Sequence, residues 1–319
     1  MKKLIGFIFV IFLFTQSNLS PRDVFPNSIQ SSAIITDKNK NDFVVLEGDS
    51  SSTPICSAKD IEIINSVFSL AKEKKLNEKP INEIIVEVGK YFLGTNYEAF
   101  TLEKPDSEQL VINLTGLDCT TYLESCAAFA RCIKQNKTSF EDYTNELKKI
   151  RYRNGIINQY PSRLHYFSDW IYDNGKKGIV KDITKELGGE PIKFNVSFMS
   201  THPENYKHLK NNPQFISIIK QQENEINKRQ YFYVPKEKVN LIDNQIQNGD
   251  LIAITTNLDG LDIGHIGIAI KMEDGKIHFM HAPLVGSKVQ ISQKPLSEYL
   301  LGIKKHTGII ILKVENILK

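Results

Sequence analysis

The order in which hydrophobic patterns follow one another constrains the fold of this chain most strongly. Up to residue 134, apolar residues recur with the period of amphipathic helices, which predicts helices over 60–74, 80–93 and 118–134. After residue 250, short runs rich in β-branched residues are separated by turn residues, at 251–255, 266–272, 276–282 and 308–314. Helices followed by closely spaced strands predict an α+β fold with an antiparallel sheet.

The remaining parts of the chain lack such clear patterns. Residues 21–57 are polar, with scattered Ser, Asn, Asp and Pro, and predict a loosely structured N-terminal arm. Residues from about 136 to 238 are rich in Lys, Asn, Gln and Tyr and predict mainly helices and loops laid over a core. We therefore expect a single domain over residues 58–319, with a mainly helical insertion at about 136–238.

The first 20 residues have the layout of a secretory signal peptide. Lys2 and Lys3 form a positively charged start, an apolar run covers residues 4–14, and polar and small residues follow. An apolar run of this length is about half of the roughly 20 residues that a membrane-spanning helix needs, so we expect no stable membrane span. The composition is typical of a bacterium, and we predict a protein exported to the periplasm or secreted, with residues 1–20 removed.

The charge balance gives no reason to expect a nucleic acid as partner. The chain has 40 Lys and Arg residues against 37 Asp and Glu residues, a net charge of +3. Without Lys2 and Lys3 the balance falls to 3 − 2 = +1, whereas nucleic-acid-binding domains carry basic patches that neutralise phosphates. We expect a monomer without nucleic acid.

The four cysteines predict at most one disulfide bond. Cys119, Cys126 and Cys132 lie in one short helical segment, which leaves Cys56 as their only distant partner. An exported protein would normally use an even number of cysteines in disulfides. This spacing instead favours a reactive thiol.

Cys119 is the strongest candidate for that thiol. Asp118 is a favoured N-cap residue, so Cys119 is expected at the first position of a helix. The free N–H groups and the positive end of the helix dipole should lower the thiol pKa there and can also form an oxyanion hole. The alternative is a buried structural cysteine, a description that suits Cys126 and Cys132.

A histidine lies at the start of the second expected strand. In residues 265–270 the alternation places three isoleucines on one face and His265, Gly267 and Ala269 on the other. The two small residues would let another element, such as a helix start, approach the histidine closely. A single histidine on a strand is more often structural, but this pattern favours a catalytic role for His265.

The hairpin that follows decides which second histidine lies beside His265. A three-residue turn over residues 273–275, with Gly275 in the left-handed conformation, places His281 on the same face as His265, with Cβ atoms roughly 7 Å apart. A two-residue turn would place His278 there instead. We favour the first register because it brings two histidines together over the small residues.

Together, Cys119, His265 and His281 have the composition of a catalytic triad with a thiol nucleophile, a base and an orienting group. The same three side chains are also zinc ligands. Neither a C-x-x-C nor an H-E-x-x-H motif is present to support a metal site. We therefore expect no metal and no cofactor.

At this point the residues resemble the NlpC-type papain-like cell-wall cysteine hydrolases, and most closely the N-acetylmuramoyl-L-alanine amidase-like branch. The resemblance extends from about residue 81 to 314, with one departure at Tyr122, where Phe is expected. The motifs that carry it are Gly94-x-x-Tyr97-x-x-x-Thr101-Leu102-Glu103, Asp118-Cys119-Thr120-Thr121-Tyr122, Ser162-Arg163-x-His165-Tyr166-x-x-Asp169-Trp170, Gly249-Asp250-Leu251-Ile252, Gly260-Leu261-Asp262-x-x-His265-Ile266-Gly267 and His281-Ala282.

The resemblance implies a permuted papain-like core, with the cysteine at a helix start packed against a sheet that carries the histidine. It also implies hydrolysis of the amide between the lactyl group of N-acetylmuramic acid and L-Ala in muropeptides, which are peptidoglycan fragments, with anhydro-muropeptides as preferred substrates. By resemblance Cys119 is the nucleophile, His265 the base and then the acid, and His281 the orienting group. Tyr97 resembles a tyrosine that helps to hold the oxyanion.

Further polar residues of these motifs are candidates for binding the substrate. Arg163 is expected to hold acidic groups, because a guanidinium binds carboxylates through two hydrogen bonds. Glu103 and Asp262 are expected to shape the pocket rather than to carry out chemistry. The full set of candidates is Thr101, Glu103, Asp118, Thr120, Arg163, His165, Tyr166, Asp169 and Asp262.

Two other functions remain open at this point. The first is a γ-D-Glu-diamino acid endopeptidase of the same superfamily, which would cut within the peptide rather than next to the sugar. The second is a non-catalytic cell-wall binding module that kept the fold. The presence of Cys119, His265 and His281 argues against the second alternative.

Overall fold

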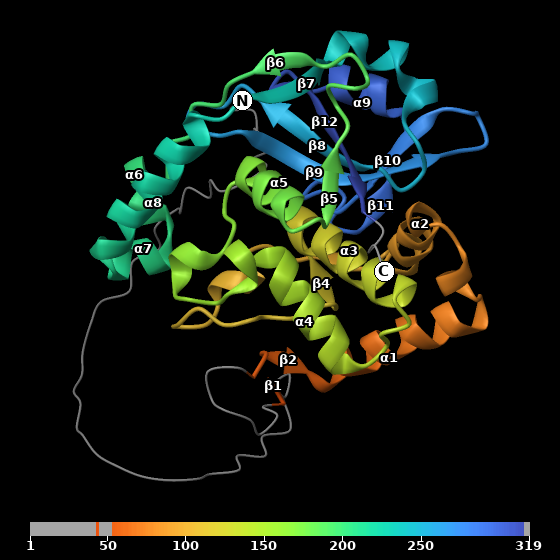
Figure 1. Cartoon of the computed structure of the whole chain (residues 1–319), viewed down its shortest axis with the longest axis horizontal. Helices are drawn as coiled ribbons and strands as arrows, with labels where there is room; N and C mark the ends of the chain where they lie inside the picture. The colour runs from red at the N-terminus through yellow and green to blue at the C-terminus, as the bar shows by residue number, and fades with distance from the viewer. Residues whose placement is uncertain (1–42, 45–52, 316–319) are drawn as a thin grey trace, which may run out of the picture.

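The computed structural model describes residues 43–44 and 53–315. The expected signal peptide and most of the expected N-terminal arm therefore lie outside the described residues. The described chain is an α+β structure, as expected, with helices packed against a mainly antiparallel sheet (Figure 1). Two short strands precede the first helix and pair with each other, β1 (Phe43–Val44) and β2 (Cys56–Ser57).

The three helices expected before residue 135, and one helix that follows them, form the layer on one face of the sheet. The helices α1, α3 and α4 each begin at an N-cap residue that forms a capping box. The capping box provides hydrogen-bond acceptors for backbone N–H groups that have no partner within the helix. α3 occupies the centre of this layer and packs against α2, α4 and strand β9. The helices of this layer are α1 (Ala58–Glu73), α2 (Ile81–Tyr91), α3 (Cys119–Lys134) and α4 (Phe140–Arg151).

All strand pairs of the main sheet are antiparallel, in the order β11-β10-β9-β8-β12-β7-β6, with β5 paired to β12. The runs of β-branched residues predicted four of these strands, β8, β9, β10 and β12. The strands are β5 (Val180–Asp182), β6 (Glu190–Ile192), β7 (Tyr231–Pro235), β8 (Leu251–Thr256), β9 (Ile263–Lys271), β10 (Ile277–His281), β11 (Gln290–Ile291) and β12 (His306–Val314).

The region between residues 136 and 238 contains more strand than the sequence predicted. Strands β5, β6 and β7 lie in this region and join the sheet, although helices and loops make up the rest. β5 and β6 have three residues each, too few for an alternating pattern to be visible. The helices that follow α4 in the chain are α5 (Phe167–Lys176), α6 (Phe198–Thr201), α7 (Lys207–Asn211), α8 (Pro213–Asn227) and, after β11, α9 (Leu296–Leu301).

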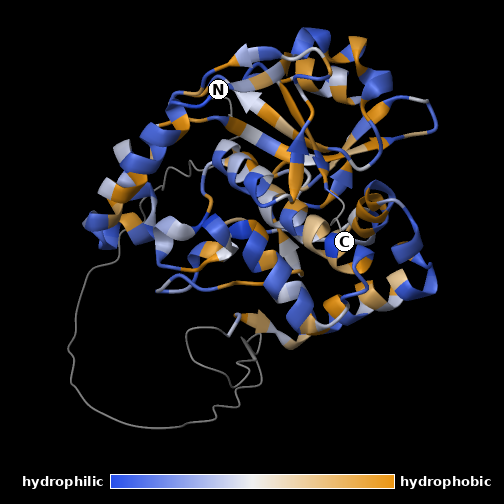
Figure 2. Ribbon diagram, in the orientation of Figure 1, coloured by the Kyte–Doolittle hydropathy of each residue, from blue (hydrophilic) through white to orange (hydrophobic). Residues whose placement is uncertain are grey.

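The two faces of the sheet support two separate hydrophobic cores. Ile266 and Ile268 of β9 belong to the larger core, which includes the helices α1 to α4. Ala269 of β9 belongs to the smaller core, together with Phe279 and residues of α9. Figure 2 shows the apolar residues concentrated along the strands and on α2. The period-two alternation of β9 therefore separates the two cores, as the sequence pattern predicted.

The element that covers Gly267 is not the one expected. α3 packs on the isoleucine side of β9, whereas the ring of Phe279 lies over Gly267. A Cβ at Gly267 would come within 2.8 Å of the Phe279 ring and 2.6 Å of the Met280 carbonyl. The small residue at this position therefore accommodates a neighbouring strand residue, not a helix start.

The hairpin between β9 and β10 has the register expected from its turn. Met272 donates its N–H to the Lys276 carbonyl at 3.0 Å, and Gly275 has a φ of +77°, in the left-handed region. Met280 pairs with Ile268, so His281 follows opposite Gly267. This register is what brings His281 next to His265.

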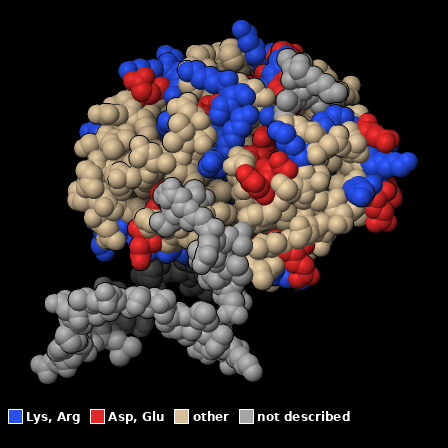
Figure 3. Space-filling model, turned by 60° about the horizontal axis from the view of Figure 1, so that its bottom comes forward, with Lys and Arg blue, Asp and Glu red and all other residues tan. Residues whose placement is uncertain are grey.

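The surface carries charges of both signs. On the face shown in Figure 3, Lys and Arg residues lie between Asp and Glu residues and uncharged surface, so no single sign dominates that face. Within the described residues, no helix is both long and apolar enough to span a bilayer.

A buried ion pair joins the central helices, and it generates a prediction about stability. Arg151 of α4 donates to Glu124 of α3 at 2.7 Å and to the Val111 carbonyl at 2.6 Å. Replacing Arg151 by Met leaves the Glu124 carboxylate buried without its cation, so Arg151→Met should lower the free energy of unfolding by about 3–5 kcal/mol. Urea denaturation followed by circular dichroism measures this loss.

The exposed pair between Lys59 and Glu62 of α1 provides the control. Lys59→Met should change the free energy of unfolding by less than about 1 kcal/mol, since water screens exposed pairs. An equally small effect of Arg151→Met would show that the buried pair does not hold α3 and α4 together.

Candidate active site

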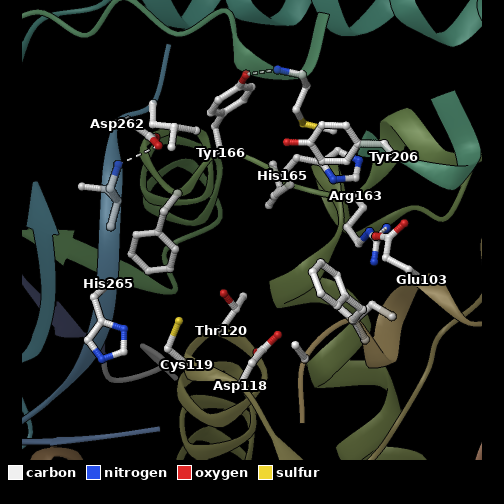
Figure 4. A pocket seen from close by; sticks show the side chains of 18 of the residues that line it. Glu103, Asp118, Cys119, Thr120, Arg163, His165, Tyr166, Tyr206, Asp262 and His265 are labelled. Atoms are coloured by element: carbon white, nitrogen blue, oxygen red, sulfur yellow. Dashed lines mark hydrogen bonds and ion pairs between the residues drawn. The ribbon is translucent and has the colours of Figure 1, made fainter. Parts of the chain in front are cut away.

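A pocket opens at the N-terminal end of α3, and most of the candidate residues line it (Figure 4). Cys119 and Thr120 lie at its base, and His265 of β9 borders them from the side of the sheet. Other walls come from the segment around the 3₁₀ helix η2 (Thr101–Glu103) and from the 3₁₀ helix η4 (Tyr160–Ser162) with the residues after it. Elements far apart in the sequence therefore converge on one cavity.

Local capping fixes the position of Cys119. Asp118 is the N-cap of α3, and its carboxylate accepts hydrogen bonds from the backbone N–H and the hydroxyl of Thr121, both at 2.8 Å. The Thr121 hydroxyl in turn accepts the Asp118 N–H at 3.0 Å. Cys119 is therefore the first helical residue, as predicted, and its side chain is buried at the base of the pocket.

A short parallel strand pair places Tyr97 beside the cysteine. β3 (Asn96–Tyr97) pairs with β4 (Gly116–Leu117), and β4 leads directly into Asp118 and Cys119. Burial raises the pKa of the Tyr97 hydroxyl, and the nearby Cys119 and Asp118 raise it further. Tyr97 therefore keeps its proton and can serve as a hydrogen-bond donor in the pocket.

A hydrogen bond joins the side chains of His265 and His281. His265 Nε2 lies 2.6 Å from His281 Nδ1, whereas His265 Nδ1 is buried and has no hydrogen-bond partner among the described residues. In Figure 4 the His265 ring lies next to the Cys119 side chain at the base of the pocket. His281 does not line the pocket but lies behind His265. This arrangement suits an orienting group.

Burial keeps both members of the cysteine–histidine pair neutral. It raises the pKa of the Cys119 thiol, and the Asp118 carboxylate adds to this, although hydrogen bonds from the Ile266 backbone and the Thr120 side chain oppose it. Burial lowers the pKa of His265 well below its ordinary value, with smaller contributions from His281 and His306. The prediction of a lowered thiol pKa is therefore wrong, because desolvation of the buried thiol is the largest effect on its pKa.

Arg163 lies in the pocket wall, where it already has carboxylate partners. It forms an ion pair with Glu103, and its Nε is 3.5 Å from Glu108 Oε1. Its guanidinium also lies over the Tyr160 ring, 5.0 Å from the centroid. The side chain expected to bind acidic groups of a substrate is thus neutralised by the protein itself.

Three further candidates build the pocket wall through their own hydrogen bonds. His165 Nε2 is 2.9 Å from the Tyr160 carbonyl, and the Tyr166 hydroxyl donates to Glu223 at 2.7 Å. Asp262 accepts the N–H groups of Ser168 and Ile263, both at 2.7 Å. All three line the pocket, and these bonds hold its walls in place.

Two candidates lie outside the pocket lining. Asp169 is buried in ion pairs with Arg153 at 2.5 Å and Arg229 at 2.6 Å, which connect the start of α5 to the residues that follow α4 and to those that follow α8. Thr101, the first residue of η2, is buried. Both side chains therefore lie outside the lining of the cavity that holds Cys119.

The pocket also contains residues that the sequence motifs did not predict. Met199 of α6, Tyr206 just before α7, Phe100 before η2 and Leu284 after β10 all line the pocket. They come from loops and short helices whose positions depend on tertiary packing. The pattern around them contains no signal that could have identified them.

The described residues contain no group of three or more His, Cys, Asp or Glu side chains that could hold a metal ion. All four cysteines are free and buried. The alternative of a Cys-His-His zinc site therefore has no support in the geometry.

Comparison with known protein families supports an assignment of the chain. A family model described as N-acetylmuramoyl-L-alanine amidase-like matches residues 87–311, which is more than half of the chain. The match includes the candidate residues from Tyr97 to His281. No curated protein matches.

Solved structures of similar proteins agree in fold. An N-acetylmuramoyl-L-alanine amidase from Bacteroides uniformis is 37% identical, with a TM-score of 0.71, and the match covers 74% of this chain and 99% of that one. A Bacteroides fragilis protein that bears the provisional name of a xylanase is 40% identical, with a TM-score of 0.69, covering 72% and 100%. A Legionella pneumophila protein, 24% identical with a TM-score of 0.60 and coverage of 81% and 95%, shares the fold alone.

The charge of Asp118 gives a testable effect on the neighbouring thiol. Asp118→Asn keeps an N-cap acceptor but removes the negative charge that raises the pKa of Cys119. The thiol pKa should fall, and alkylation of Cys119 by iodoacetamide at fixed pH should become faster by about tenfold per pKa unit. Mass spectrometry of the peptide that contains Cys119 measures the rate.

Asp118→Ala serves as the control for that experiment, since it removes the charge and the cap together. It should also destabilise the protein by roughly 1 kcal/mol. If Asp118→Asn alkylates no faster than the unaltered protein, the carboxylate does not influence the thiol.

Proposed function

This chain belongs to the N-acetylmuramoyl-L-alanine amidase-like family, and we propose that it is a cysteine amidase acting on muropeptides. The bond cut is the amide between the lactyl group of N-acetylmuramic acid and L-Ala. The observation that carries this proposal is the convergence of Cys119, His265 and Tyr97 on one pocket, within the region that matches the family.

The first step begins from a neutral thiol and a neutral imidazole. His265 Nδ1, to which no other described residue is hydrogen-bonded, accepts the thiol proton as Cys119 Sγ attacks the lactyl carbonyl carbon. His265 Nε2–H then donates to His281 Nδ1, which fixes the ring and its tautomer. Because both groups are neutral before the substrate binds, the proton moves only when a carbonyl is in place.

The negative charge that develops on the carbonyl oxygen needs donors at the base of the pocket. The backbone N–H of Cys119, at the first position of α3, and the Tyr97 hydroxyl supply them. The raised pKa of Tyr97 supports this role, since the hydroxyl stays protonated at any working pH.

The intermediate collapses when protonated His265 gives its proton to the amide nitrogen. The carbon–nitrogen bond breaks, L-Ala leaves with a free amine, and the lactyl carbonyl remains on Cys119 as a thioester. Water, deprotonated by His265, then attacks the thioester carbon and releases the lactyl carboxylate. The thiol regains its proton, and the enzyme returns to its starting state.

Several finer features belong to the same proposal. The core is a permuted papain-like fold, and anhydro-muropeptides are the preferred substrates. The protein works as an exported monomer in the periplasm or outside the cell, after removal of residues 1–20. The motifs shared with the NlpC-type hydrolases support the fold and the substrate preference. The order of charged and apolar residues at the N-terminus supports export.

One similar protein bears the name of a xylanase, which is an enzyme that cuts glycosidic bonds. The pocket of this chain gives little support for such a reaction. Such enzymes use two carboxyl groups placed on either side of the bond that is cut. Here Glu103 is paired with Arg163, Asp118 caps α3, and Asp262 accepts two backbone N–H groups. The thiol and the imidazole are better placed for chemistry.

Product analysis tests the proposed reaction. Purified muropeptides with and without the anhydro end are incubated with the protein and with Cys119→Ala, and products are identified by mass spectrometry. The proposal predicts a peptide with free N-terminal L-Ala and a peptide-free sugar, both absent with Cys119→Ala. A faster reaction of the anhydro form would support the proposed preference.

Three outcomes of that experiment would redirect the proposal. A cut within the peptide would identify the γ-D-Glu-diamino acid endopeptidase instead. Release of sugars from xylan by the protein, unaffected by Cys119→Ala, would favour glycoside hydrolysis. Binding of muropeptides without any cleavage would favour the binding module.

The role of Tyr97 gives a second prediction. Tyr97→Phe keeps the ring but removes the donor hydroxyl, so kcat should fall by about 10- to 1000-fold while KM changes little. Tyr91→Phe is a suitable control, because Tyr91 is exposed at the end of α2 and does not line the pocket. An unchanged kcat for Tyr97→Phe would leave the oxyanion to the backbone N–H of Cys119 alone.

A further inference from the structure

Phe100 has the most exposed of the large apolar side chains that line the pocket. It lines the cavity that holds Cys119 and is 44% exposed, although Thr101 beside it is buried. Exposed apolar residues are ordinary on an open surface, but in the wall of a pocket such a side chain offers contact area to a ligand. Phe100 occupies an unspecified position of the sequence motif that contains Tyr97 and Glu103. It is therefore a pocket residue without an assigned role.

The backbone of Phe100 has a conformation that is rare for a bulky residue. Its φ of +61° and ψ of +21° lie in the left-handed region, which favours glycine. Phe100 is the N-cap of η2, and its carbonyl accepts the N–H of Glu103 at 3.0 Å. Glycine would form this turn without strain, so the gain from phenylalanine is its ring. Residues in such strained conformations cluster at binding sites.

The loop that carries Phe100 is braced on both sides. The carboxylate of Glu98 forms an ion pair with Lys104 at 2.6 Å, which closes the loop over residues 98–104. The Glu98 N–H donates to the carbonyl of Leu117 at 3.3 Å, and Leu117 lies two residues before Cys119. The loop is thus tied to the strand that leads to the nucleophile. A substrate does not have to order this loop when it binds, which favours affinity.

The wall that continues from Phe100 indicates which part of a ligand the ring would contact. Glu103, on the same 3₁₀ helix, lines the pocket and pairs with Arg163, as Figure 4 shows. A pyranose ring has an apolar face of C–H groups and polar hydroxyl and acetamido groups at its edge. An aromatic ring beside paired polar groups matches this distribution. Because Arg163 is already paired with Glu103, the same wall is less suited to a peptide carboxylate.

We propose that Phe100 is a specificity-determining residue, whose ring packs against the apolar face of the N-acetylmuramic acid ring while the lactyl carbonyl lies at Cys119. The inference rests on the proposed function, which places that carbonyl at Cys119. It adds a contact that lies away from the bond that is cut. The contact is equally strong before and during the reaction, so it acts on KM and not on kcat.

Kinetics on two substrates separate a contact with the sugar from a contact with the peptide. One substrate is the muropeptide, and the other is the same peptide with a lactyl group but no sugar. Phe100→Gly should raise KM for the muropeptide by about three- to tenfold, with kcat little changed. It should leave kcat/KM for the sugar-free substrate unchanged. Equal losses on both substrates, or no loss on either, would overturn the inference.

Two further variants at this position identify the ring as the cause. Phe100→Tyr keeps the ring and should retain the KM of the unaltered protein. Phe100→Asn removes the ring, but asparagine tolerates the left-handed conformation, so this variant should raise KM as much as Phe100→Gly. A KM for Phe100→Asn equal to that of the unaltered protein would show that the ring does not bind the sugar.

A stability measurement with a matched control excludes an effect of the backbone. Glycine suits the φ of Phe100, so Phe100→Gly should leave the midpoint of urea denaturation unchanged or raised. Lys75→Gly is the control, since Lys75 is exposed, lies outside the pocket lining and caps the 3₁₀ helix η1 (Leu76–Glu78) with a φ of +51°. Lys75→Gly should leave KM unchanged. An equal rise of KM in both variants would assign the effect to backbone flexibility and overturn the inference.

A binding measurement distinguishes failure of this inference from failure of the proposed reaction. Cys119→Ala protein with labelled phenylalanine rings is titrated with N-acetylmuramic acid alone and, separately, with the peptide alone, and followed by NMR. The chain has 17 phenylalanines, and the Phe100 signal is the one that Phe100→Leu removes. This signal should shift with the sugar and not with the peptide. A shift with the peptide only, or with neither, would overturn the inference, whereas a shift with the sugar in a protein that cuts elsewhere would overturn only the proposed bond.

Discussion

The contact between the start of α3 and strand β9 is the interaction on which the rest of the site depends. Nearly all side chains of α3 are buried, so the helix can occupy only one place, between the sheet and the other helices. The Asp118 cap fixes where the helix begins, and the strand pair of β3 and β4 delivers the chain to that point. The Cys119 thiol, its backbone N–H and Tyr97 are positioned by the same packing that builds the core.

This burial also explains why Cys119 and His265 are both neutral. Desolvation disfavours a charged thiolate and a charged imidazolium alike, so it raises the pKa of Cys119 and lowers the pKa of His265. A thiol at an exposed helix start would ionise more readily, and it would also react with other electrophiles and oxidants. In the proposed mechanism the pair ionises only around a bound carbonyl, which favours selectivity over intrinsic reactivity. His281 fits that proposal because it is hydrogen-bonded to the His265 ring and burial keeps it neutral.

The sequence predicted those parts of the structure that depend on local patterns. The helix starting at Cys119, the strands β8, β9, β10 and β12 and the pairing of His265 with His281 follow from capping, alternation and turn chemistry over short spans. The pocket residues Met199 and Tyr206 could not be found this way, since their segments reach the pocket only through tertiary packing. The thiol pKa was mispredicted for a similar reason, because burial is a property of the whole fold.

Arg163 shows how far a residue type alone can mislead about a binding site. An arginine in a pocket suggests an acidic ligand, but Glu103 and Glu108 neutralise this one, and burial raises the pKa of Glu108. Glu103 Oε2, Glu108 Oε2 and the Tyr160 hydroxyl are buried around it without partners among the described residues. Of these residues, Glu103 and Tyr160 line the pocket with Arg163, so this wall is richer in oxygen atoms than in positive charge, and it suits the hydroxyl and amide groups of a sugar better than a peptide carboxylate. The sugar side of the proposed substrate thus fits the charge distribution of the pocket.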